Sequence, residues 1–305
     1  MAKGGGGNGF VVFAQAMQAA VTERHRLAKD LRDAVTFEQF ETFYQPVMKL
    51  RDQTIIGVEA LVRWRHPTLG LISPARFIPL AEELGIIGDI GRIVLRQACR
   101  QAARWQSSHR GLTVAVNVSV FQLRSDDFAD SVRSALETNG LDPSCLVLEI
   151  TESILINDAE TSLKRLRALT EIGVRLAIDD FGSGYSSLSY LEHFPFDILK
   201  IDQSFVDAII DSPKAVEMVR TIIQLGRRLK LDVIAEGVET EQQLEILQRL
   251  HCPEAQGYLF SQPIEVAAID RFLHEHRLSG PPPGRRSPDA PPGAPPEMVP
   301  VSAFT

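Results

Sequence analysis

Seven side chains that could carry chemistry lie at or near the ends of apolar runs in this chain. They are Glu59, Asn117, Glu149, Asp179, Asp180, Lys200 and Glu236. Asp179 and Asp180 are adjacent, directly after the apolar run 174–178 and before a loop that contains Gly182 and Gly184. Two neighbouring carboxylates repel each other, and each resists ionisation unless a cation lies between them. The pair is therefore either a solvated Asp-Asp turn or part of a cation site.

The remaining members of the set favour the cation site. Carboxylates and one amide, with no Cys or His among them, are the oxygen ligands that suit Mg²⁺, Mn²⁺ or Ca²⁺ rather than Zn²⁺ or copper. If they converge, Asp179 and Asp180 could serve two ions at once, as expected for metals ~3.5–4 Å apart. Two such ions would hold a phosphoryl oxygen and generate hydroxide at neutral pH. The residue types thus indicate hydrolysis of a phosphate ester.

Three of these residues have alternative interpretations. Glu59 lies inside the apolar run 55–62, and burial of an unpaired carboxylate is costly, so it needs a partner or faces solvent. Lys200 either points among the acids, where it would hold the attacking water or offset charge, or is a surface lysine at a strand end. Glu236 is a candidate general base, but the roles of base and metal ligand cannot be separated by sequence.

The elements that position these residues alternate between strand and helix. The predicted strands are 43–48, 54–62, 113–119, 145–152, 174–178, 198–202, 231–237 and a last unit within 254–260. The predicted helices are 11–35, 75–84, 89–106, 125–139, 158–171, 213–229, 240–250 and 264–277.

This alternation implies βαβ units and a parallel sheet. Eight such units in about 250 residues fit a closed (β/α)8 barrel, in which catalytic groups come from the C-terminal strand ends. Asp52 predicts a tight hairpin between the first two strands, so the first strand could run antiparallel to the rest. An open doubly wound sheet is the competing fold. It usually carries a G-x-G-x-x-G turn after an early strand, and none is present.

Composition limits the function classes. The net charge of −7, from 32 basic and 39 acidic residues among 305, argues against a groove for long nucleic acid. Three cysteines without C-x-x-C spacing suit free thiols in a reducing compartment. Neither a long apolar run nor a signal peptide is present. We therefore expect a cytoplasmic chain without a membrane segment of its own, although a parent protein could be anchored through another region.

At this point a family resemblance is evident. The motifs that carry it are Glu59-Ala60-Leu61 with Arg63, Asn117-Val118-Ser119, Glu149-Ile150-Thr151-Glu152, Asp179-Asp180-Phe181-Gly182-Ser183-Gly184, Leu199-Lys200-Ile201-Asp202, Ala235-Glu236-Gly237-Val238-Glu239 and Gln256-Gly257-Tyr258. Over about residues 36–278 they resemble the EAL domain family of cyclic di-GMP phosphodiesterases. The resemblance implies a modified TIM-type (β/α)8 barrel with an antiparallel first strand. It also implies hydrolysis of cyclic di-GMP to linear pGpG, with two Mg²⁺ or Mn²⁺ ions and inhibition by Ca²⁺.

The resemblance also implies roles for single residues. The metal ligands would be Glu59, Asn117, Glu149, Asp179, Asp180 and Glu236, with Asp179 as the bridge. The catalytic residues would be Glu236, Lys200, which orients the water, and Glu59. Gln45, Arg63 and Gln256 match substrate-binding positions, and Glu152 and Glu239 match loop-stabilising ones. Ser183 replaces a common threonine and keeps the hydroxyl. A homodimer through the helices beside the Asp180 loop is implied as well. A catalytically silent cyclic di-GMP receptor is the alternative from another class, and the complete ligand set favours the enzyme.

The ends of the chain lead to a three-part division. Residues 1–35, a glycine-rich start and a basic amphipathic helix, resemble the end of a GGDEF domain, so we expect a piece of a GGDEF–EAL tandem protein. A membrane-binding helix or an unrelated amphipathic helix are the alternatives. Residues 36–278 would form the phosphodiesterase barrel. The proline-rich tail 279–305 is predicted to be disordered.

Overall fold

The computed structural model describes residues 8–152, 159–182, 191 and 193–276, with side chains from residue 22 onward. The predictions for the glycine-rich start, for Ser183 and the loop after Asp180, and for the tail 279–305 lie outside these described residues. Within them, no helix combines the length and the apolar composition that crossing a bilayer requires.

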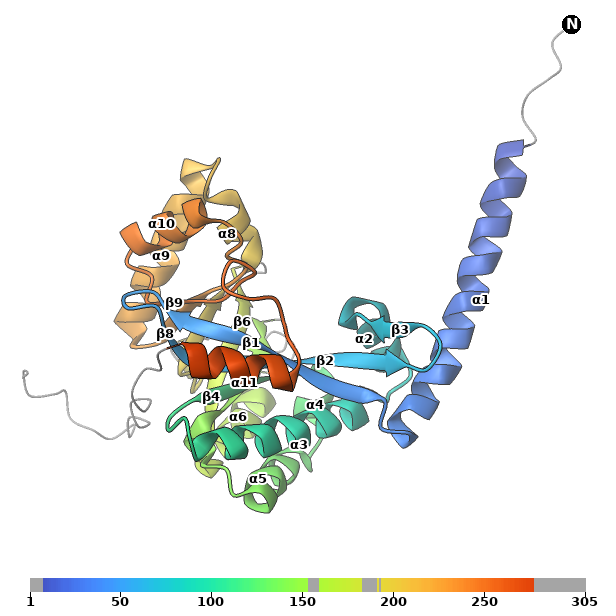
Figure 1. Ribbon diagram of the computed structural model, residues 1–305, viewed down its shortest axis with the longest axis horizontal. Coiled ribbons are helices and arrows are strands. Elements are labelled where there is room, and N and C mark those ends of the chain that lie inside the picture. The colour runs from blue at the N-terminus through green and yellow to red at the C-terminus, as the bar shows by residue number, and fades with distance from the viewer. Residues whose placement is uncertain (1–7, 153–158, 183–190, 192, 277–305) are drawn as a thin grey trace, which may run out of the picture.

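One sheet closes into a barrel at the centre of the described chain (Figure 1). Its strands are β1 (Phe40–Lys49), β2 (Thr54–His66), β3 (Gly70–Ile72), β4 (Thr113–Val118), β5 (Leu146–Thr151), β6 (Arg175–Phe181), β7 (Ile198–Ile201), β8 (Asp232–Ala235) and β9 (Glu254–Ala255). They follow the order β1-β9-β8-β7-β6-β5-β4-β2-β3, and the pairing of β1 with β2 closes the ring. β1 is antiparallel to both its neighbours, whereas β2 and β4 to β9 pair in parallel. The predicted modified (β/α)8 barrel is confirmed.

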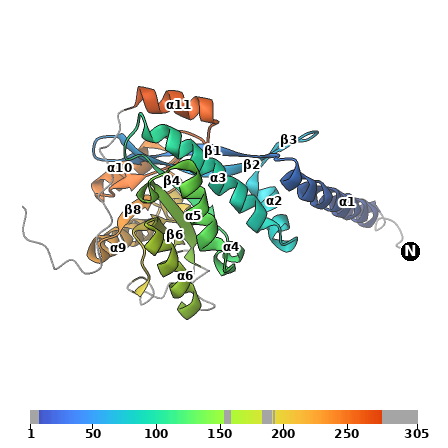
Figure 2. The same ribbon diagram turned by 90° about the horizontal axis from the view of Figure 1, so that it is seen from below.

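Helices surround the barrel, as the second view shows (Figure 2). They are α1 (Asn8–Thr36), α2 (Pro74–Glu83), α3 (Ile87–Gln106), α4 (Val120–Arg124), α5 (Phe128–Asn139), α6 (Ala159–Ile172), α8 (Gln203–Ala208), α9 (Pro213–Leu229), α10 (Glu241–Arg249) and α11 (Val266–Glu275), with a 3-10 turn at Pro143–Cys145. Between them and the sheet lies one large apolar core, and a small separate cluster fills the inside of the barrel.

Most predicted elements are confirmed within a few residues, and the differences have local causes. β2 continues to His66 because the short strand β3, which was not predicted, pairs with its end from Trp64 onward. α4 was not predicted either. A reciprocal pair of hydrogen bonds between Ser119 and Gln122 caps it, and Ser125, in extended conformation, separates it from α5.

The predicted hairpin between β1 and β2 is also confirmed. Asp52 Oδ1 accepts hydrogen bonds from the backbone N–H of Thr54 at 3.3 Å and from its hydroxyl at 2.5 Å. Gln53 takes a left-handed backbone with φ of 52°, which completes the tight turn.

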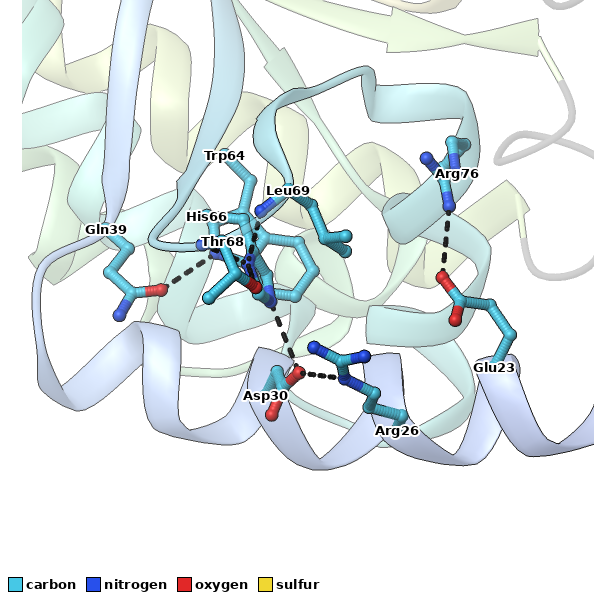
Figure 3. A network of polar contacts seen from close by, with 9 residues as sticks. All are labelled: Glu23, Arg26, Asp30, Gln39, Trp64, His66, Thr68, Leu69 and Arg76. Atoms are coloured by element: carbon cyan, nitrogen blue, oxygen red, sulfur yellow. Dashed lines mark hydrogen bonds and ion pairs between the residues drawn. The ribbon is translucent and has the colours of Figure 1, made fainter.

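The C-terminal half of α1 packs against α2 and the end of β2, while its N-terminal half extends away (Figures 1 and 2). Leu27, Leu31 and Ala34 belong to the main apolar core, and Leu31 and Ala34 are completely buried. Helices of this kind gain most of their stability from such an apolar face. Figure 3 shows the polar contacts beside it, among them Glu23 of α1 with Arg76 of α2.

A buried histidine connects α1 to the end of β2 (Figure 3). His66 Nδ1 accepts the backbone N–H groups of Thr68 and Leu69, both at 3.2 Å. Nε2 therefore carries the ring hydrogen and donates it to Asp30 Oδ2 of α1 at 3.2 Å. This contact fixes α1 to the strand that also carries Glu59.

Candidate active site at the barrel mouth

Strand geometry explains why the polar residues form one layer above an apolar one. The inner cluster of the barrel consists of Val47, Ala115, Val147, Ala177, Ile198 and Ile234. Side chains two positions apart on a strand share a face. Two positions toward the C-terminal ends of the parallel strands lie Asn117, Glu149, Asp179, Lys200 and Glu236. β1 runs antiparallel, so its residue in this layer precedes Val47 by two positions. This residue is Gln45, which lies directly across from Glu59 of β2. The sequence-predicted site residues thus converge at one mouth of the barrel.

Lys200 lies at the centre of this layer. Its side chain is 1% exposed, and four carboxylates surround it. Nζ lies 2.8 Å from Glu149 Oε1 and 2.8 Å from Glu236 Oε1. It is also 3.2 Å from Asp179 Oδ1 and 3.8 Å from Glu59 Oε2. The interpretation of Lys200 as a surface lysine is therefore wrong, and four acids outnumber one base at this point.

Two amides connect the carboxylates of the ring. Gln256 Nε2 donates hydrogen bonds to Glu59 Oε2 at 2.6 Å and to Glu236 Oε1 at 3.0 Å. Asn117 Nδ2 donates to Glu59 Oε1 at 2.6 Å. Both oxygens of Glu59 are thereby paired, which explains how a glutamate can be buried within an apolar run.

Asp180 joins the cluster because β6 is irregular there. Neighbouring side chains on a regular strand point to opposite faces. The β6–β7 register shifts between Ile178 and Phe181, and Asp180 has a left-handed φ of 55°. As a result Asp179, Asp180 and Glu236 each offer a carboxylate oxygen, and these oxygens lie within 4.8 Å of one another.

Sequence reasoning missed one acid in this group. Asp202 at the end of β7 lies near Asp180, and burial together with the charges of Asp179 and Asp202 raises the pKa of Asp180 to about 6. Asp202 also caps α8 through a hydrogen bond from the Ser204 N–H. Its position two residues after Lys200, directly after the end of β7, is the signal that could have found it.

The crowding of acids also shifts the pKa values of Lys200 and of the glutamates around it. Burial would lower the pKa of Lys200, but the surrounding carboxylates outweigh it and hold that pKa well above its ordinary value. Burial and the charge of Glu59 raise the pKa of Glu149 well above its usual range, and burial does the same for Glu236. The pKa of Glu59 is lowered, because Lys200 and the two amides outweigh its burial.

Three buried oxygens in the site have no hydrogen-bond partner among the described residues. They are Glu149 Oε2, Asp179 Oδ1 and Gln256 Oε1. Asp179 Oδ1 lies within ion-pair distance of Lys200 but lacks hydrogen-bond geometry to it. A buried acceptor without a donor is costly, and a nearby cation can compensate such an oxygen. These oxygens, together with a donor set made only of carboxylates and amides, fit a divalent cation that prefers oxygen ligands.

The predicted substrate-binding residues border this layer. Gln45 is buried, and its Nε2 donates to the backbone oxygen of Ser261 at 3.0 Å. The Arg63 guanidinium lies 5.5 Å from the centroid of the Phe43 ring and donates to Val62 O at 2.9 Å. Gln256 is the third such residue, and here it contacts the acids themselves.

The two predicted loop-stabilising glutamates differ in their surroundings. Glu152 Oε2 accepts the backbone N–H of Gly182 at 3.3 Å, so it contacts the start of the segment after Asp180. Glu239 is exposed, and its backbone N–H donates to Gln243 Oε1 at 2.8 Å.

Comparison with known proteins identifies the family of this site. The model of the EAL domain matches residues 28–263, which is most of the chain. The chain belongs to the EAL domain family. Its domain is 43% identical over 281 residues to the "Cyclic di-GMP phosphodiesterase NbdA" of Pseudomonas aeruginosa, covering 92% of this chain and 36% of that protein.

A second relative and a solved structure are also similar to most of this chain. The "Bifunctional diguanylate cyclase/cyclic di-GMP phosphodiesterase MucR" of the same organism is 45% identical over 88% of this chain and 39% of its own length. A solved structure, "PaMucR Phosphodiesterase, c-di-GMP complex", has a TM-score of 0.77 at 44% identity and covers 80% of this chain and 99% of the solved chain. This EAL domain chain thus spans little more than a third of the length of these two full-length relatives.

Proposed function

We propose that this EAL domain hydrolyses one phosphodiester bond of cyclic di-GMP and releases linear pGpG. The observation that carries the proposal is the cluster of acids at the barrel mouth. Four carboxylates surround the buried Lys200, and two of them, Asp179 and Glu236, each offer an oxygen within 4.8 Å of one from Asp180. The names of the relatives, and the solved complex of one relative with cyclic di-GMP, support the choice of substrate.

Glu59, Asn117, Glu149, Asp179, Asp180 and Glu236 would hold the metal ions in this proposal. Mg²⁺ or Mn²⁺ bound there would supply Lewis-acid activation of water and charge compensation for the phosphate. Ca²⁺ would compete and inhibit, because it prefers more ligands at longer distances than a magnesium site provides.

The chain's own residues then have separate tasks. Glu236 accepts a proton from the attacking water, and Lys200, 2.8 Å from Glu236 Oε1, orients that water and offsets charge on the phosphoryl oxygens. The water oxygen forms a bond to phosphorus, the bond from phosphorus to the ribose 3′ oxygen breaks, and that oxygen leaves with a proton. Glu59 holds the ring together through its two amide partners. Gln45, Arg63 and Gln256 bind the substrate at the rim.

Assembly and location complete the proposal. The domain forms a homodimer through the helices beside the segment after Asp180, and Glu152 supports that segment through Gly182. Glu239 stabilises the turn after β8. The chain works in the cytoplasm, and its three free, buried cysteines suit a reducing compartment. Residues 1–35, 36–278 and 279–305 remain the proposed linker, barrel and tail of a tandem protein.

The test is incubation with cyclic di-GMP and Mn²⁺ or Mg²⁺, with the products identified by mass. We expect pGpG in stoichiometric yield, no product in EDTA, and less product when Ca²⁺ is added. Binding of cyclic di-GMP without any pGpG at micromolar enzyme would contradict the proposal and indicate the silent receptor instead.

A further inference from the structure

A polar groove lies on the outside of the barrel, between α3, α11 and the start of β1, away from the acidic ring. α3 and α11 lie side by side in both views, next to β1 (Figures 1 and 2). The groove consists of two adjoining cavities of about 380 and 260 Å³, which share Gln101, Arg104 and Val266 in their walls. Cavities of a few hundred Å³ are the size of small-molecule sites.

Two exposed arginines of this groove form no ion pair among the described residues. Arg100 and Arg104 lie one turn apart on α3, line the larger cavity, and form no ion pair or side-chain hydrogen bond with any described residue. The third arginine there, Arg65, is already paired with Glu41 at 2.6 Å and Glu265 at 3.1 Å. The two cavities together carry three arginines and three carboxylates, and two of these carboxylates, Glu41 and Glu265, are engaged by Arg65.

A glutamine between the two arginines lines the same groove. Gln101 is only 7% exposed and lines both cavities, yet its side chain has no hydrogen-bond partner within the part of the chain that the structure describes. Its amide atoms are not among the buried, unpartnered side-chain atoms, so they are open to the groove and can bond to water or to a ligand there. Gln97, the neighbouring glutamine in the wall, already donates to Phe40 O at 2.9 Å.

The N-terminus of α11 opens into the larger cavity. Val266 and Ala267, the first two residues of this helix, line it, and Glu265 at the cap position makes no side-chain capping hydrogen bond. The first N–H groups of a helix and its dipole favour an anion. Two unpaired guanidinium groups match the charge of about −2 that a phosphate monoester carries at neutral pH, whereas a carboxylate would neutralise only one.

We propose that this groove binds the phosphate monoester of a small soluble molecule. Arg100, Arg104 and the N-terminus of α11 hold the phosphate, and the Gln101 amide donates to it. The organic part of the ligand extends along α11 into the smaller cavity, which Trp105 and His274 line. Asp270 in that cavity is engaged by Trp105 Nε1 at 2.7 Å, so its carboxylate is partly satisfied.

The test is calorimetric titration of the full chain with GMP and, separately, with inorganic phosphate. EDTA is present, so that the metal-free acidic mouth repels both anions. We expect saturable binding of one GMP per chain, weaker binding of inorganic phosphate, and a loss of at least about ten-fold in affinity in the Arg100→Gln/Arg104→Gln variant. Gln101→Glu, which keeps the side-chain shape but adds a negative charge, abolishes binding.

Arg96→Gln is the matched control, because Arg96 is an exposed arginine of the same helix outside the walls of the groove. It leaves the affinity unchanged, and thermal unfolding checks that every variant is folded. No saturable binding of either probe up to about 10 mM would overturn the proposal. Binding that survives the double substitution, or that Arg96→Gln weakens equally, would also overturn it. Equal affinities for phosphate and GMP would overturn the assignment of an organic ester.

Discussion

The residues of the barrel mouth carry more negative than positive charge. Lys200 is 1% exposed among four carboxylates, and buried oxygens of Glu149 and Asp179 lack hydrogen-bond partners among the described residues. Such an excess of buried negative charge lowers stability when nothing compensates it. In the proposed function, divalent cations compensate this excess.

Glu149→Gln tests this balance. In EDTA we expect the variant to be more stable than the unsubstituted chain by about 1 kcal/mol, because one of four crowded carboxylates is removed while Lys200 keeps three. Mg²⁺ raises the unfolding temperature of the unsubstituted chain through preferential binding to the folded state, and that increase is smaller in the variant. Thermal unfolding with and without Mg²⁺ measures both effects.

Glu245→Gln is the control, since Glu245 is exposed on α10, outside the site. It should change neither the stability in EDTA nor the effect of Mg²⁺. A Glu149→Gln variant that loses stability in EDTA and keeps the full response to Mg²⁺ would refute the assignment of Glu149 as a metal ligand.

At the scale of single residues, the sequence was sufficient for most of the site. The spacing of polar residues after apolar runs indicated Asn117, Glu149 and Glu236, because strand periodicity places them above the inner apolar layer. It could not show that Gln256 connects Glu59 to Glu236, since these contacts span three strands. Asp202 was missed because a strand-end acid that also caps a helix has an ordinary structural explanation.

Among the elements, the short strand β9 closes the barrel and buries the carboxyl group of Glu254. It pairs with β1 and β8, and it brings Glu254 beside Asp232 of β8. Burial and the charge of Asp232 raise the pKa of Glu254 from 4.5 to about 7, although Arg175 and Lys49 act in the opposite direction.

This shift predicts a pH dependence. A carboxyl group whose pKa is higher in the folded state binds more protons there, so its contribution to stability is complete below about pH 4.5 and is lost as the pH rises through about 7. We expect Glu254→Gln to remove this loss, so that the variant gains up to about 3 kcal/mol relative to the unsubstituted chain between pH 4.5 and 7. Denaturant unfolding across this range measures the difference. A difference that stays constant with pH would contradict the account.

The elements also show where sequence patterns stop being informative. Long periodic helices such as α3 and α9 were predicted within a few residues. The strand β3 was not predicted, because its three residues are too few to show a periodic pattern and Leu69 and Leu71 are exposed. Only its pairing with Trp64 to His66 makes this segment a strand. That α1 packs against the end of β2 through Asp30 and His66 was equally hidden, since it depends on a contact across 36 positions.

At the scale of the whole molecule, the proposed homodimer makes a simple prediction. The chain should sediment with about twice its mass of 33.8 kDa at high protein concentration. Sedimentation equilibrium over a range of concentrations measures this. A single species of monomer mass at every concentration would contradict the dimer, without affecting the assignment of the active site.

The central claim is that the acidic mouth of the barrel is where cyclic di-GMP is cleaved. The most direct measurement compares the rate of pGpG formation by the unsubstituted chain and by Asp179→Asn, in Mn²⁺ and at equal concentration. Asp179 is one of the proposed metal ligands, and its amide isostere keeps the shape of the side chain. The account predicts a rate lower by at least about 100-fold in a variant with an unchanged far-ultraviolet circular dichroism spectrum. Turnover equal to that of the unsubstituted chain would contradict it.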